Sequence, residues 1–180
     1  MLLWIALRYS CTANSNKASC KYPDIGGIMS KDLVESYIAN CTEFEKVVRS
    51  IGANDLSRIP KEGEWSAAYV IHHMADADMH FATRFLHILT VDKPAIVPFD
   101  EDVYPDRLKY SSRDAHDSLA SIFGLHKVVA NILKLVDDAD WNRVGIHSEK
   151  GEVTLAEVLT LASNHTKSHV GQLQEIISSL

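Results

Sequence analysis

The sequence predicts an all-α protein, a four-helix bundle with one long crossover, and three observations support that class. Four segments place apolar residues at the three- and four-residue steps of a helix, and neither an internal repeat nor a low-complexity block interrupts them. The chain has 180 residues, the size of one ordinary domain. Residues 91–110, between the second and third segments, show no period and contain three prolines. An extended connection of this kind lets two successive helices of a bundle run parallel.

The first two helices are defined by their start and stop signals. The first is expected from Ser30 to about Ile51, with a glycine directly after it. The second follows Ser66, whose hydroxyl can accept a hydrogen bond from an unpaired amide of the first turn. It should continue to about Thr90, because the prolines downstream cannot extend a helix.

The second half of the chain predicts two further helices and a small hairpin. Ser111, with an acidic residue three positions later, resembles a capping box, so the third helix is expected from there to near Asp140. Residues 141–153 alternate in short pieces around a glycine-containing turn, which predicts a small hairpin before the fourth helix. Thr154 and Glu157 form a second capping box, from which the fourth helix should run almost to the last residue.

Composition and charge limit the function classes. Apolar residues make up 46% of the chain and charged residues 23%, as in soluble globular proteins. A net charge of -6 gives nucleic acid and anionic membranes no electrostatic reason to bind, and no stretch approaches the roughly 20 apolar residues of a membrane span. The three cysteines form no CxxC pair, so neither a disulfide framework nor a thiolate zinc site is indicated. A cytoplasmic protein is the simpler expectation.

Residues 1–29 are expected to form a disordered tail, and the folded domain is expected over residues 30–180. The apolar run Leu2–Leu7 is shorter than the apolar region of a secretory signal and has no basic segment before it. Met29, directly before the predicted helix start, is therefore a candidate for the first residue of the natural product.

Two histidines of the fourth helical segment carry the strongest chemical signal. His165 and His169 lie on the apolar stripe that defines the buried face of this segment. Residues four apart are separated by about 6 Å of rise on one face, so two imidazoles can converge on one ion. A single histidine on an apolar face is more often a hydrogen-bonded core residue, and for this pair alone both interpretations remain open.

The second helical segment supplies a third imidazole. His73 shares one face with Tyr69, Asp76, His80 and Arg84. Burying that face is costly unless its ionisable groups bind a cation or one another. If the second and fourth helices pack side by side, His73 faces the other two histidines. Three neutral imidazoles plus solvent suit zinc, nickel, iron or copper and leave coordination positions for a substrate.

Other site classes lack their motifs. The HxxxH pair has no glutamate at its second position, so the general base of HExxH metalloproteases is missing. The paired ExxH motifs of di-iron bundles do not occur, and no nucleophile elbow surrounds a serine or cysteine. The three-histidine site is the chemistry that the sequence predicts.

The chain resembles the DinB/YfiT-like family of metal-dependent proteins over about residues 30–180. Glu64–Ser66 followed by Val70–Asp76 is similar to the family's signature in its second helix. Asn164–Leu173 is similar to its HxxxH signature in the fourth helix, and Pro94–Glu101 to the crossover of the YfiT branch.

The resemblance implies an up-down-down-up bundle, commonly a homodimer, with one divalent ion (zinc, nickel or iron) held by His73, His165 and His169. These are the histidines that the face geometry selects. His72 then points elsewhere, and Asp76 and His80 are candidates for orienting a ligand imidazole, or else solvated or paired charges.

The function implied by the resemblance is metal-dependent chemistry on a small molecule: transfer of a low-molecular-weight thiol to a small electrophile, or hydrolysis. A three-histidine dication keeps its double charge and can lower the pKa of water to about 7 or stabilise a thiolate. Proton or anion partners are expected among the polar residues of the second helix if they border the cavity: Tyr69, Asp76, His80 and Arg84. The alternative is a non-catalytic, metal-binding stress-response module, which a fourth protein ligand such as His80 or Asp76 would favour.

Overall fold

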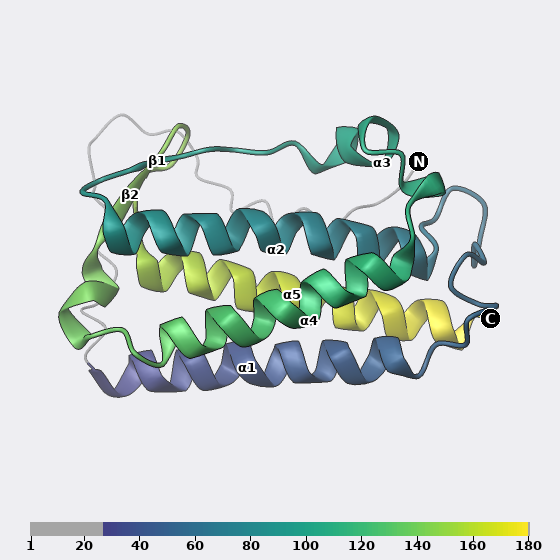
Figure 1. Ribbon diagram of the computed structural model, residues 1–180, viewed down its shortest axis with the longest axis horizontal. Coiled ribbons are helices and arrows are strands. Elements are labelled where there is room, and N and C mark those ends of the chain that lie inside the picture. The colour runs from purple at the N-terminus through teal and green to yellow at the C-terminus, as the bar shows by residue number, and fades with distance from the viewer. Residues whose placement is uncertain (1–26, 180) are drawn as a thin grey trace, which may run out of the picture.

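The computed structural model describes residues 27–179, and four long helices dominate it (Figure 1). They correspond to the four predicted segments: α1 (Gly27–Arg49), α2 (Ala67–Thr90), α4 (Ala115–Leu133) and α5 (Leu155–Ser178). The predicted class, a helical bundle, is confirmed, with a small sheet added at one end. Helix α1 begins at Gly27 and not at Ser30, so residues 27–29 of the predicted tail are helical and the prediction is wrong there; residues 1–26 of the tail lie outside the described residues.

The helix directions place the amino-terminal part of α2 beside the carboxyl-terminal part of α5. In Figure 1, α1 and α5 run from left to right, whereas α2 and α4 run from right to left. The connection from α2 to α4 returns along the length of α2. The two stretches that carry the predicted metal ligands are therefore neighbours.

The starts of α2 and α5 follow from local hydrogen bonding. The Ser66 hydroxyl accepts a hydrogen bond from the Tyr69 amide at 3.4 Å, as predicted for its position before α2. At α5 both halves of the capping box are present. The Glu157 amide donates to the Thr154 hydroxyl at 3.1 Å, and the Thr154 amide donates to the Glu157 carboxylate at 2.7 Å.

The third long helix differs from its prediction at both ends. Asp114, whose backbone is extended, caps α4 with its own carboxylate. Ser111 lies outside that helix, in the 3-10 turn η2 (Tyr110–Ser112), so the predicted start there is wrong. Helix α4 ends at Leu133, before the predicted end near residue 140, and the 3-10 helix η3 (Asp138–Asn142) follows.

The crossover is more structured than its lack of period suggests. It contains β1 (Ala95–Ile96), the 3-10 helix η1 (Glu101–Val103) and the short helix α3 (Tyr104–Arg107). Its far end is tied to α2, because the Tyr110 hydroxyl donates to the Asp76 carboxylate at 2.7 Å and Arg113 donates to both of its oxygens at 2.7 and 2.9 Å. These contacts fix the crossover against the helix that carries His73.

The predicted hairpin is present and gains a third strand. Strands β2 (Val144–His147) and β3 (Gly151–Thr154) pair antiparallel, and β1 of the crossover adds to β2 in parallel, which the sequence analysis did not predict. Gly145 makes this approach feasible. A Cβ atom there would lie 2.8 Å from the Ile96 side chain, too close for any other residue without a shift.

The core fills the space between the four long helices. Side chains with no exposed surface come from each of them, including Phe44, Ile71, Ile122 and Leu173. None of the helices within residues 27–179 combines the length and apolar character that a membrane crossing requires.

Candidate metal centre

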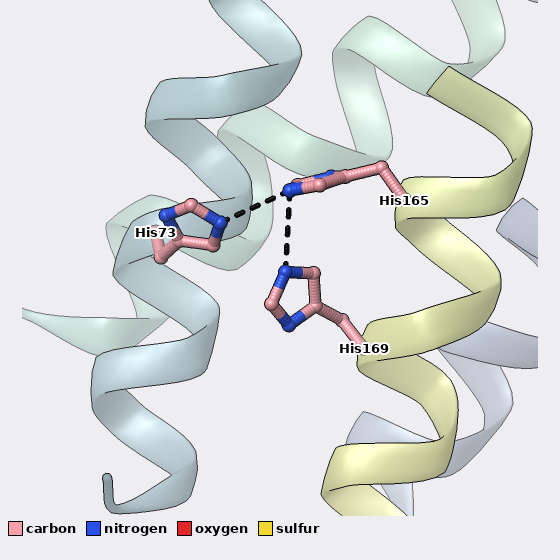
Figure 2. A group of neighbouring side chains, drawn as sticks. All are labelled: His73, His165 and His169. Carbon is pink, nitrogen blue, oxygen red and sulfur yellow. Dashed lines mark hydrogen bonds between the residues drawn. The ribbon is translucent and has the colours of Figure 1, made fainter. Parts of the chain in front are cut away.

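Three histidines from two helices meet between α2 and α5 (Figure 2). The Nε2 atom of His165 lies 3.1 Å from Nε2 of His73 and 3.2 Å from Nε2 of His169. The potential ligand atoms of all three lie within 4.8 Å of one another. The structure thus brings together the three residues that the sequence predicts as ligands.

Two of the three nitrogen spacings in the triad fit one transition-metal ion. A tetrahedral ion with metal–nitrogen bonds of about 2.0–2.1 Å holds its ligand nitrogens about 3.3 Å apart. The two measured separations, 3.1 and 3.2 Å, are close to that value. Two of the rings come from successive turns of α5 and the third from α2, so the donor set depends on the packing of these helices.

Burial keeps the three imidazoles neutral, the form in which a histidine nitrogen can bind a metal. Burial and the neighbouring His169 lower the pKa of His73 to about 3. Burial and the other two imidazoles lower the pKa of His165 well below its usual value. The pKa of His169 is lowered by burial as well, although its contact with Gln172 opposes the shift.

A neighbouring amide selects the right tautomer of His169. Nδ1 of His169 lies 2.7 Å from Oε1 of Gln172, so the ring donates its Nδ1 proton to that oxygen. Its Nε2 lone pair is then left for an ion, as metal-binding histidines require. Among the described residues, Nδ1 of the buried His165 ring has no hydrogen-bond partner.

Two more side chains border the triad, and the sequence analysis gave neither a role. Oε2 of Glu101, from η1 of the crossover, lies 3.7 Å from Nε2 of His73. Burial raises the pKa of Glu101, and Asp102 and Asp100 raise it further. The Trp65 indole lies 5.5 Å from the His73 ring, centroid to centroid. Both residues lie in the stretches that carry the family resemblance. That resemblance was the signal in the sequence by which they could have been found.

A cavity of about 580 Å³ opens at the triad. His165 and His169 form part of its wall, and Trp65 and Glu101 lie on the wall as well. Its other lining residues come from the loop before α2 and from the last turns of α5: Pro60, Gly63, Glu64, Ser168, Gly171, Gln172, Glu175, Ile176 and Ser179. The volume is in the range of small-molecule sites.

Asp76 does not orient a ligand imidazole, contrary to the role considered from the sequence. Its carboxylate pairs with Arg113 and Tyr110, as described for the crossover. Its neighbour His72 also points away from the triad, as expected, with Nδ1 2.9 Å from the Ser118 hydroxyl of α4. These groups join α2 to α4 and to the crossover.

His80 also has partners other than the ligand imidazoles. Its Nε2 lies 2.6 Å from the Tyr104 hydroxyl, and its ring stacks on Phe99 at 4.3 Å. Arg84 donates to the backbone carbonyl of Val97 at 3.0 Å. The sequence analysis expected proton or anion partners from α2 only if their side chains border the cavity. The described residues that line the cavity include none of the four candidates: Tyr69, Asp76, His80 and Arg84.

Comparisons of sequence with known proteins give consistent relatives. The family model of the DinB superfamily matches residues 38–173. A "Putative metal-dependent hydrolase" from Geobacillus thermodenitrificans is 32% identical over 148 residues, which are 79% of this chain and 83% of the relative. The "Putative metal-dependent hydrolase YfiT" of Bacillus subtilis is 31% identical over 135 residues, which are 74% of this chain and 76% of the relative.

Solved structures share the fold. The structure of YfiT from Bacillus subtilis, described as a probable metal-dependent hydrolase with an unusual four-helix bundle topology, superposes with a TM-score of 0.72 at 24% identity over 91% of this chain and 94% of YfiT. A mycothiol-dependent maleylpyruvate isomerase superposes with a TM-score of 0.67 at 11% identity, over 80% of this chain and 60% of the isomerase. At these identities the likeness concerns the fold alone.

The family match includes all three histidines of the triad, and the relatives cover most of the bundle. The chain therefore belongs to the DinB superfamily.

Proposed function

We propose that this protein is a metal-dependent enzyme that transfers a low-molecular-weight thiol to a small electrophile. One divalent ion, zinc, nickel or iron, would be held by His73, His165 and His169. The observation that carries the proposal is the convergence of three neutral imidazoles, two of which, His165 and His169, line a cavity of about 580 Å³. We also propose that the four long helices follow one another in up-down-down-up order. In this arrangement the triad lies between α2 and α5.

The ion supplies Lewis acidity when bound, which lowers the pKa of water to about 7 or keeps a thiol in its thiolate form. The chain supplies the rest. Gln172 holds the His169 tautomer through the 2.7 Å contact, and Trp65 packs near His73, where its indole limits the access of water. Three histidine ligands leave coordination positions free for a reactant.

Glu101 is the group we propose to accept the proton of the nucleophile. Its Oε2 is 3.7 Å from His73 Nε2, and its half-buried carboxylate has a raised pKa, which suits a group that must take up and return a proton. In thiol transfer, sulfur bonds to the electrophilic carbon while the leaving group departs with its electron pair. The proton of the thiol passes to Glu101 and then to the leaving group.

Hydrolysis is the second candidate, because the relatives from Geobacillus and Bacillus carry the name of metal-dependent hydrolases. The same residues serve both reactions, with water in place of the thiol. Thiol transfer is placed first because a mycothiol-dependent isomerase shares the fold and because the cavity volume can accommodate two reactants. A non-catalytic stress-response module would need no cavity beside its ion, so the cavity favours catalysis.

The remaining parts of the proposal concern partners. We propose a small-molecule substrate and no nucleic-acid partner, in line with the net charge of -6. A homodimer is also proposed, because large apolar side chains remain exposed on the bundle, among them Leu135 at 82% and Val128 at 57%. Action in the cytoplasm is the expectation that goes with a thiol cosubstrate.

The test begins with metal content. Protein purified without a metal-affinity tag is expected to carry close to one transition-metal ion per chain by elemental analysis. His73→Ala, His165→Ala and His169→Ala should each lose most of the metal. His116→Ala, an exposed control on α4, should keep it. Folded protein that cannot take up any ion would contradict the proposal.

The second step is turnover. The metal-loaded protein is screened with cellular thiols against a generic electrophile, and with an ester without thiol. Thiol-dependent product is expected, and Glu101→Gln should reduce it at unchanged metal content. Ester cleavage without thiol would move the assignment to hydrolysis, and no turnover with either would support the non-catalytic alternative.

A further inference from the structure

Among the described residues that line the cavity, every aspartate, glutamate, lysine or arginine is a glutamate. Within the described part of the chain they are Glu64 from the loop before α2, Glu101 from the crossover and Glu175 from the last turns of α5. Between residues 27 and 179, no lysine or arginine lines the cavity. The cavity wall therefore has a negative bias in addition to the two histidines of the triad, His165 and His169, that line it.

The end of α5 adds to this bias. Helix α5 ends at Ser178. Gln172 and Glu175 of its last turns line the cavity, and so does Ser179 directly after it. The carboxyl end of a helix carries a partial negative charge from its unpaired carbonyl groups. No basic side chain stands in the last turn of α5 to offset that charge. A cation in the cavity would meet both the carboxylates and this helix end.

An aromatic side chain completes the arrangement. Trp65 lines the same cavity directly after Glu64 in the chain, and its indole also borders His73. The face of an indole attracts an ammonium group, and the attraction is stronger where the cation is shielded from water. Carboxylates with an aromatic face are therefore a recognition surface for a protonated amine.

We propose that the cavity selects a reactant that carries a protonated amino group, with Glu64, Glu175 and Trp65 as the residues that recognise it. This inference deepens the proposed function and rests on it, because the other end of the reactant would lie at the triad. Aminothiols are the simplest molecules of that class, with sulfur at one end and an ammonium group at the other.

The test compares three thiols of similar size and different charge: cysteamine, 2-mercaptoethanol and mercaptoacetate. Cobalt(II)-loaded protein reports thiol binding directly, because a thiolate on cobalt gives a charge-transfer absorption, and no turnover is needed. The measured quantity is the ratio of the dissociation constants of mercaptoacetate and cysteamine. Comparing variants at one pH cancels the different acidities of the thiols.

Glu64→Gln combined with Glu175→Gln is expected to lower that ratio about fourfold or more. An exposed charge pair changes a dissociation constant about 1.4- to 5-fold. Each carboxylate acts twice on the ratio, because it attracts cysteamine and repels mercaptoacetate. The control is Glu35→Gln combined with Glu149→Gln, which changes the net charge equally at exposed positions outside the cavity and should leave the ratio as in the wild type. Added salt should shrink the wild-type preference.

The outcomes separate the two proposals. An unchanged ratio in the Glu64/Glu175 variant, with absorption bands present for all three thiols, would overturn amine selection and leave the metal site intact. Absence of any band would count against the proposed function. In that case propylammonium and propionate are compared on the metal-free protein by the indole resonance of Trp65, identified with Trp65→Phe. Only the cation should shift it, and equal responses or none would overturn amine selection.

Discussion

Replacing His126 with leucine leaves a buried carboxylate without its partner. Nε2 of His126, on α4, lies 3.0 Å from Oδ2 of Asp78, on α2, and the two side chains are 3% and 7% exposed. The other ring nitrogen lies 3.7 Å from the Glu45 carboxylate of α1. The imidazole of His126 therefore links α4 to α2 and α1 through charge interactions with two carboxylates.

The geometry gives the size of the effect. At 3.0 Å, opposite unit charges attract by about 5.5 kcal/mol at an effective dielectric constant of about 20. Most of this attraction offsets the cost of burying the two charges. The loss of stability in His126→Leu therefore measures the penalty of leaving the Asp78 carboxylate buried without a partner. Removing one partner of a buried pair typically costs 3–5 kcal/mol, so His126→Leu should lose about that much of the free energy of unfolding at pH 7.

The pH dependence follows from the same pair. Burial alone would lower the pKa of His126, but its contacts with Asp78 and Cys41 outweigh burial and raise it to about 10. The folded protein then holds a proton that the unfolded chain releases near pH 6.5. This stabilisation is complete below pH 6.5 and is lost as the pH rises to about 10.

Urea unfolding followed by circular dichroism measures both effects. The double variant His126→Leu/Asp78→Ala replaces both partners with apolar groups at nearly constant volume and should return to within about 1.5 kcal/mol of the wild type. Its stability should also decline less between pH 6.5 and 10. A single variant as stable as the wild type, or a double variant worse than His126→Leu, would refute the assignment of a buried ion pair.

Three further predictions concern the triad and the crossover. Metal-free protein should lose stability as the pH falls from 6.5 to 3, because burial lowers the pKa of His73 to about 3 and the unfolded chain takes up protons first. Urea midpoints at several pH values test this, and His73→Gln should flatten the dependence of stability on pH. An ion present at a hundredfold excess over its dissociation constant should stabilise the fold by about 2.7 kcal/mol; a chelator should reverse the shift in Tm by calorimetry, and His165→Ala should abolish it. Asp76→Asn weakens the bonds from Arg113 and Tyr110 and should cost about 1–3 kcal/mol, measured by urea unfolding, whereas equal stability would mean that the crossover is held by other contacts.

The parts of this fold that the sequence predicted well are set by local signals. Ser66 and Thr154 each stand directly before a helix, because the side chain of each accepts a hydrogen bond from an amide in the first turn of that helix. The triad was found by the same kind of argument, since His165 and His169 share a helix face and His73 needed only the packing of α2 against α5.

The parts that the sequence missed depend on distant contacts. Glu101 lies in a crossover without a period, and its approach to His73 follows from ties such as that between Asp76 and Arg113. The pairing of β1 with β2 needs the absent side chain of Gly145, which no local pattern reveals. At the start of α4, the sequence analysis took Ser111 as the cap, whereas Asp114, whose backbone is extended, caps the helix.

On the proposed function, the separation of the triad along the chain would make metal loading a reporter of tertiary structure. His73 and His165 are 92 residues apart, so an unfolded chain must close a long loop before the third imidazole can join the other two. Of the triad, nascent or denatured molecules would offer an ion only His165 and His169, which are close in sequence, with correspondingly weaker affinity. Uptake of the cation should consequently follow, and never precede, the docking of α2 on α5, and a trapped folding intermediate that lacks this contact should be recognisable by its failure to retain metal.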